Sequence, residues 1–179
     1  MAEVLERGRV TFLFRPKVDV SAPRGIDDVQ RFWVVLAHAA GRRRIAVGRK
    51  RMPHLRDREA NWGFVDALDA DVARDLDERE YVTKTRGERL QPGARRVAEG
   101  DYALVRHGDH VHLTWNVAEE DPEMSRELEI GPRGSVLVAV LHFHGWVPAR
   151  PEELDRHHAE LLFFAHTERA EIADETAVK

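Results

Sequence analysis

The chain has 179 residues, a formal net charge of −4 and no cysteine. This length fits one ordinary domain, or one domain with a short appendage, and it buries a sizeable core without disulfides. The lack of cysteine excludes disulfide frameworks, thiolate zinc sites, iron–sulfur clusters and cysteine nucleophiles. No apolar run reaches the roughly 20 residues that cross a bilayer, and the N-terminus has no signal-peptide pattern. We therefore expect a cytoplasmic protein with no membrane partner.

Alternating apolar residues predict strands in the first part of the chain. In residues 9–20, Phe12 and Phe14 share one face, and Pro16 fits a strand end or an edge strand. A turn-like segment follows.

Residues 29–39 and 42–52 are two β-rich runs around an Ala-Gly break, and they predict a hairpin. A short helix capped by Asp27 or Asp28 is the alternative for the first run. Its β-branched and aromatic content favours the strand.

The middle of the chain mixes strand and helix patterns. Residues 61–68 fit either. Residues 69–80 predict a helix, because Val72 and Leu76 recur at a spacing of four behind an aspartate cap. Residues 80–89 return to the alternation typical of a strand.

Two segments dominate the C-terminal part. Residues 134–146 are continuously apolar, which predicts a central strand covered on both faces. From Pro151 onward, leucines such as Leu154 and Leu161 lie on one stripe and predict a terminal amphipathic helix.

The expected fold is therefore α+β: a mostly antiparallel sheet of about six or seven strands, one internal helix and the C-terminal helix. Residues 1–150 are expected to form the single domain, and residues 151–179 a helix packed on it or extending from it.

The segment of residues 102–117 predicts a hairpin with a two-residue turn at Gly108-Asp109. In this register the core face carries Tyr102 and Trp115. Three histidines lie together on the opposite face: His107, His110 and His112. Such a set is a candidate site for a divalent metal cofactor with an open position that activates water. The simpler interpretation is the polar outer face of a half-buried sheet.

Charge is distributed unevenly along the chain. Residues 1–58 hold 14 Lys/Arg against 6 Asp/Glu, residues 59–83 hold 2 against 8, and residues 84–106 hold 6 against 3. Arginine forks bind phosphate or carboxylate oxygens, so the basic segments predict a concave anion site if their strands are neighbours. Its candidate residues are Arg49, Arg51, Lys84, Arg86 and Arg89. A solvated face paired with nearby acids is the alternative.

The sequence contains no Walker-type phosphate loop, dinucleotide fingerprint or nucleophile elbow. Three hypotheses follow. The first is a non-catalytic binding domain for an anionic small molecule, a nucleic acid or an acidic protein, through the arginine-rich strands. The second is a metal-dependent hydrolase that uses the histidine hairpin, assisted by Glu99 or Asp109. The third is a structural protein that docks through its C-terminal helix.

Overall fold

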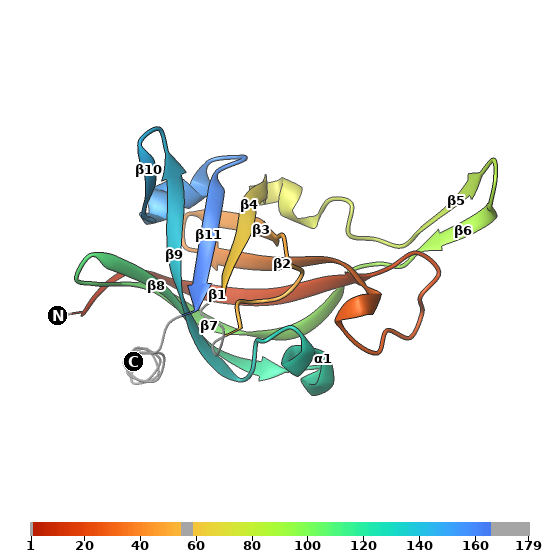
Figure 1. The fold of residues 1–179 in the computed structure, drawn as a ribbon, viewed down its shortest axis with the longest axis horizontal. Helices are drawn as coiled ribbons and strands as arrows, with labels where there is room; N and C mark the ends of the chain where they lie inside the picture. Colours follow the sequence, from red (N-terminus) through yellow and green to blue (C-terminus); the bar gives the residue numbers. More distant parts are fainter. Residues whose placement is uncertain (1, 55–58, 166–179) are drawn as a thin grey trace.

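The computed structural model describes residues 2–54 and 59–165, and these residues form an almost entirely β fold (Figure 1). Eight strands pair antiparallel around a complete ring and so close a barrel, which leaves the ring with no open sheet edge. In ring order they are β1 (Ala2–Pro16), β2 (Val29–His38), β3 (Gly41–Val47), β4 (Ala60–Leu68), β11 (Glu160–Ala165), β9 (Arg133–His142), β8 (His110–Glu119) and β7 (Arg95–His107).

Several short elements lie outside the ring. The strand β10 (Gly145–Pro148) pairs with the last part of β9. A separate two-stranded sheet consists of β5 (Arg79–Thr83) and β6 (Gly87–Gln91). Among the described residues no helix has the length and apolar character that a membrane crossing requires. The helical elements are η1 (Ile26–Asp28), η3 (Asp69–Ala73), α1 (Pro122–Glu127) and η4 (Pro151–Asp155).

The predicted α+β fold is wrong, because the predicted internal helix does not form. The segment of residues 69–80 holds only the single turn η3, which ends at Ala73. Asp75 then adopts a φ of 59°, a left-handed conformation that ends any helix. Val72 is the only fully buried residue of η3, so little apolar burial holds a longer helix in place.

The predicted C-terminal amphipathic helix is also wrong within the described residues. After the short turn η4, residues 160–165 form β11, which pairs with β4 on one edge and with β9 on the other. Leu161 and Phe163 belong to the main core, and Leu162 between them lies on the outer face. A leucine-rich segment that fits a helical stripe is thus stabilised as a strand by pairing on both edges. Residues 160–165 therefore present no helical face for docking, and residues 166–179 of the predicted helix lie outside the described residues.

Both predicted hairpins form. The strands β2 and β3 pair from Trp33↔Ala46 to His38↔Gly41. The strands β7 and β8 pair in the predicted register, with His107 opposite His110 and Tyr102 opposite Trp115. Gly108 has a φ of 63°, which fits glycine at the first position of the turn. Local turn chemistry therefore fixes these two pairings.

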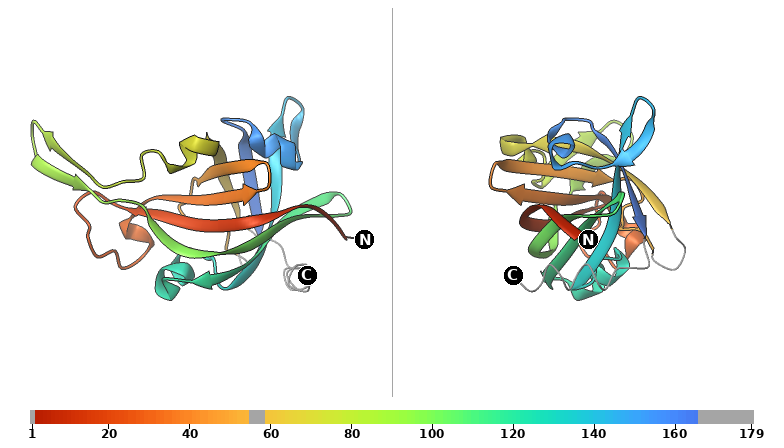
Figure 2. Two further views of the ribbon diagram at one scale, coloured as in Figure 1. Left: turned by 180° about the vertical axis from the view of Figure 1, so that it is seen from behind. Right: turned by 90° about the vertical axis from the view of Figure 1, so that its left-hand side faces the viewer.

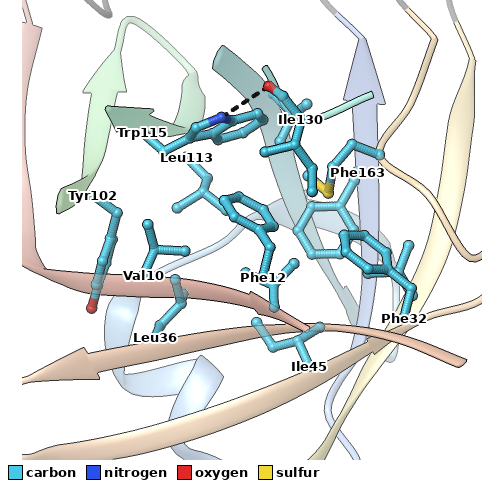
Figure 3. Close-up of a cluster of buried hydrophobic side chains, with 14 of the residues drawn as sticks. Val10, Phe12, Phe32, Leu36, Ile45, Tyr102, Leu113, Trp115, Ile130 and Phe163 are labelled. Carbon is cyan, nitrogen blue, oxygen red and sulfur yellow. Dashed lines mark hydrogen bonds between the residues drawn. The ribbon is translucent and has the colours of Figure 1, made fainter. Parts of the chain in front are cut away.

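Apolar side chains from all eight strands fill the barrel interior. Figure 3 shows one cluster of them. The ring of Phe12 packs edge-on against Trp115, with centroids 5.4 Å apart, and parallel to Phe32 at 6.2 Å. The indole N–H of Trp115 donates a hydrogen bond to the carbonyl of Ile130 at 3.2 Å, which satisfies the buried polar atom. The barrel has a packed core at this level, so functional groups must lie at its ends or outside it.

Candidate functional site

The β5–β6 hairpin, residues 79–91, forms an arm that projects from the barrel (Figures 1 and 2). Its tip is built by local turn chemistry. The hydroxyl of Thr83 accepts a hydrogen bond from the backbone N–H of Arg86 at 2.9 Å and donates one to the carbonyl of Gly87 at 3.3 Å. Gly87 has a φ of 69°, which glycine adopts without a Cβ penalty. The turn therefore holds its shape without support from the barrel.

Strand register sorts the side chains of the arm onto two faces. Opposed residues share a face, so Arg79, Tyr81 and Arg89 lie together. The guanidinium of Arg79 lies 5.5 Å from the ring centroid of Tyr81, a cation–π contact. Arg89 is paired with Asp19 at 2.9 Å. This face thus combines one cation stacked on an aromatic ring with a second cation that is already neutralised.

The tip of the arm carries two exposed cations, Lys84 and Arg86. Within residues 2–54 and 59–165, neither side chain has a carboxylate within ion-pair distance. Both are exposed, so an external anion can pair with them without breaking an ion pair of the described residues.

The other two residues of the predicted anion site follow the end of β3. Arg51 and Arg49 both contact Glu59, at 2.8 and 3.6 Å. They lie outside any strand, and β3 pairs with β2 and β4 rather than with the arm. A shared concave site required the segment of Arg49 and Arg51 to lie beside the strands of the arm. In the described sheets the arm strands β5 and β6 pair only with each other. The predicted anion residues therefore fall into two separate groups, and their role in binding stays a prediction.

The histidine hairpin has the predicted geometry, but its three rings have different surroundings. His112 is buried, and its Nδ1 lies 3.5 Å from the hydroxyl of Ser135, whereas His107 and His110 are exposed. The ring centroids of His107 and His112 are 6.5 Å apart. No group of three or more metal-ligating side chains within the described residues is close enough to hold an ion. Metal binding at these histidines remains a prediction.

A buried ionic network, which is not among the expectations stated above, lies inside the barrel wall. Arg43 is fully buried on β3 and donates hydrogen bonds to two carboxylates. Its guanidinium reaches Glu6 on β1 at 2.6 and 3.2 Å, and Asp155 in η4 at 2.8 and 3.0 Å. Charge-assisted bonds of this kind offset the high cost of burying a charge. The network therefore ties η4 to β1 and β3.

Two further side chains complete the network. The hydroxyl of Tyr102 donates to Glu6 at 2.6 Å. Gly8 leaves room for this ring, since a Cβ there would lie 2.8 Å from the Tyr102 side chain and 2.1 Å from a backbone oxygen. His38 Nε2 lies 3.1 Å from Arg43. The other ring nitrogen of His38, Nδ1, lies 3.8 Å from a carboxylate oxygen of Glu6.

The network shifts the ionisation of its members. Burial by itself lowers the pKa of Arg43, but the hydrogen bonds and negative charges of Glu6 and Asp155 outweigh it and raise the pKa above its usual value. Burial, together with the hydrogen bond to Glu6, raises the pKa of Tyr102 far above the usual range of a phenol. Arg43 stays charged and Tyr102 stays protonated at neutral pH. The arrangement is a closed set of satisfied partners, which is typical of a structural network.

A second ionic cluster holds the other side of η4. Glu153 is buried and contacts His142 on β9, together with Arg150 at 3.0 Å and Arg156 at 3.5 Å. Burial raises the pKa of Glu153, but its hydrogen bonds to His142 and Arg150 outweigh this effect and lower the pKa below its usual value. Between the two clusters Leu154 enters the main core. The turn η4 is thus fixed by charge on both sides and by apolar burial at its centre.

The sequence carries one signal for the buried network. In residues 41–47 the alternation that places Ile45 and Val47 inside the barrel also places Arg43 inside. A single arginine in step with core residues predicts a buried cation that needs carboxylate partners. Comparisons with known proteins add no assignment: no protein-family model, no curated protein and no solved structure matches this chain.

Proposed function

We propose that this protein binds a nucleic acid duplex through the arm, residues 79–91, without catalysing a reaction on it. The observation that carries the proposal is the pair of unpartnered cations, Lys84 and Arg86, at the tip of a projecting two-stranded ribbon. A ribbon outside the barrel exposes backbone groups that most proteins cover, and Val82 on it is 76% exposed. Contact with a partner would cover the exposed backbone groups and the Val82 side chain.

The dimensions and chemistry of the arm fit a duplex. The major groove of B-form DNA admits a two-stranded β-ribbon, and proteins that read DNA with such ribbons insert them there. Lys84 and Arg86 would contact phosphates. Arg79 and Tyr81 on one face of the ribbon would lie against the groove wall or base edges.

The charge distribution limits the contact to the arm. The chain as a whole has a net charge of −4, whereas residues 79–91 contain four cations and two carboxylates. Acidic residues at the base of the arm, such as Asp75, Asp77 and Glu78, would repel phosphates there. The tip therefore approaches a polyanion first, and the expected affinity is modest and strongly dependent on salt.

The test is fluorescence anisotropy of a labelled 20-base-pair duplex titrated with the full chain at several salt concentrations. Each neutralised phosphate contributes about 0.9 to the slope of log K against log salt. The double variant K84Q/R86Q is therefore expected to reduce the slope by about 2 and to weaken binding about tenfold or more at low salt.

Two control variants locate the contact. R126Q removes an exposed cation on α1, and R49Q removes one beside Glu59; both are expected to bind as the unmodified chain does. Absence of salt-dependent binding to any duplex would rule out the proposal. Unchanged binding by K84Q/R86Q would also do so, and a loss confined to R49Q would move the site to the end of β3.

A further inference from the structure

Three large aromatic side chains are exposed on the outer surface of the barrel, away from the proposed nucleic acid contact. Trp62 and Phe64 alternate with core residues on β4 and are 53% and 38% exposed. Trp146 on β10 is 37% exposed. Soluble domains rarely leave several large apolar side chains together on one surface unless they bind something there.

An open hollow lies beside two of these aromatic rings. Its volume is about 360 Å³, within the range of small-molecule sites. It is lined by Gly48, Trp62, Gly63, Phe64, His158 and Glu160. Gly48 has no side chain that would narrow the hollow beside Trp62, whereas a side chain at Gly63 would point into the barrel, toward Phe163.

The rings are held in place by their neighbours. The rings of Trp62 and Trp146 are perpendicular, with an interplanar angle of 87° and centroids 5.3 Å apart. This edge-to-face contact supports the Trp62 ring and favours one ring position. Strand pairing places Phe64 directly opposite Glu160, so these two side chains share the outer face. Aromatic surface and a carboxylate therefore meet in one small site.

Glu160 gives the hollow its charge preference. The side chain is exposed, and within the described parts of the chain it makes no ion pair. A carboxylate beside π-faces attracts a cation, because the negative faces of tryptophan and phenylalanine add to its field. The cation that suits such a site is weakly hydrated and has an apolar surface of its own. A trimethylammonium group has both properties, whereas a primary ammonium is strongly hydrated.

We propose that this hollow binds a small molecule that carries a trimethylammonium group. Trp62 and Phe64 contact the methyl groups, and Glu160 balances the positive charge. The site is on β4 and β11, and its occupancy is independent of the arm and of the proposed duplex binding. It would make this chain a binding protein with two separate ligand surfaces.

The experiment compares choline with its neutral isostere 3,3-dimethyl-1-butanol, by titration of the full chain and observation of tryptophan fluorescence and indole NMR signals. The two compounds have nearly the same shape and differ in charge. Choline is expected to bind with a Kd on the order of 1 mM, and the isostere about tenfold more weakly, as expected for a cation–π site with a carboxylate.

Variants assign the contacts. W62A is expected to weaken choline binding about tenfold, and E160Q about threefold to tenfold. W62F retains a ring and should keep part of the affinity, which separates loss of the site from loss of the fold. The matched control is F143A, because Phe143 is 96% exposed in the β9–β10 turn and lines no part of the hollow.

Equal binding of choline and its isostere would overturn the proposal in favour of an apolar hollow without charge preference. Absence of choline binding would overturn it as well. Binding of a trimethyl-lysine peptide without binding of free choline would overturn the assignment to a small molecule. Duplex binding by W62A serves as an independent readout: it is expected to be unchanged, so failure of one proposal does not decide the other.

Discussion

Arg43 and Arg86 come from similar basic segments of the chain but have opposite environments. Arg43 is completely buried and hydrogen-bonded to Glu6 and Asp155, whereas Arg86 is exposed at the tip of the arm and has no carboxylate partner in the described residues. The first arginine stabilises the fold, and the second is available for an external anion. A basic segment therefore becomes a binding site only where the fold leaves its charges unpaired.

The largest expected effect comes from removing the buried cation. In R43M the carboxylates of Glu6 and Asp155 lose their common partner. Breaking a buried ion pair in this way costs about 3–5 kcal/mol of unfolding free energy. We expect a loss near the lower end, about 3 kcal/mol, because the side chain of Asp155 is 46% exposed and can turn to water. Urea denaturation followed by tryptophan fluorescence measures it.

The double variant E6Q/R43M is the control for the charge explanation. Neutralising Glu6 removes the uncompensated buried charge while keeping a hydrogen-bond acceptor for Tyr102, so part of the lost stability should return. A loss below about 1 kcal/mol for R43M would show that the network contributes little.

The partners of Arg43 are far from it in the sequence, and this separation explains why the network was not predicted. Arg43 is separated by 37 residues from Glu6 and by 112 residues from Asp155. The β7–β8 and β2–β3 hairpins, by contrast, have partners next to each other in the chain and turn residues that specify the pairing. The Gly108-Asp109 turn between two alternating runs was enough to predict the register from His107–His110 to Tyr102–Trp115.

Closure of the barrel also depends on pairing between segments that are far apart in the sequence. Residues 160–165 contain a leucine pair and a phenylalanine pair, which fit a helical stripe as well as a buried strand. Pairing with both β4 and β9 decides between these possibilities, and neither partner adjoins this segment in the chain. The unpaired cations at the arm's tip were predicted as anion-binding candidates, but the separation of Arg49 and Arg51 from them depends on the sheet order.

An intermediate effect is expected for Tyr102. In Y102F the carboxylate of Glu6 loses one hydrogen bond but keeps Arg43, so the expected loss is about 1–2 kcal/mol. The pH dependence is a second readout. Because the folded-state pKa of Tyr102 is raised above the ordinary value of 10.0, its stabilisation is complete below pH 10.0 and is lost as the pH rises above that value. Y102F should therefore unfold less steeply with alkaline pH than the unmodified chain. Equal slopes would contradict the buried-phenol explanation.

The smallest effect on stability is expected at the arm. In K84Q/R86Q no ion pair of the described chain is broken and no buried surface changes, so the unfolding free energy should stay within about 0.5 kcal/mol of its original value. Urea denaturation of the same protein preparation that is used for duplex binding makes the comparison direct. A loss of several kcal/mol would mean that the two cations support the fold as Arg43 does, and the contrast between the regions would disappear. Unchanged stability together with weakened duplex binding would show that the exposed cations of the arm contribute to binding and not to folding. Arg43, by contrast, contributes to the stability of the barrel.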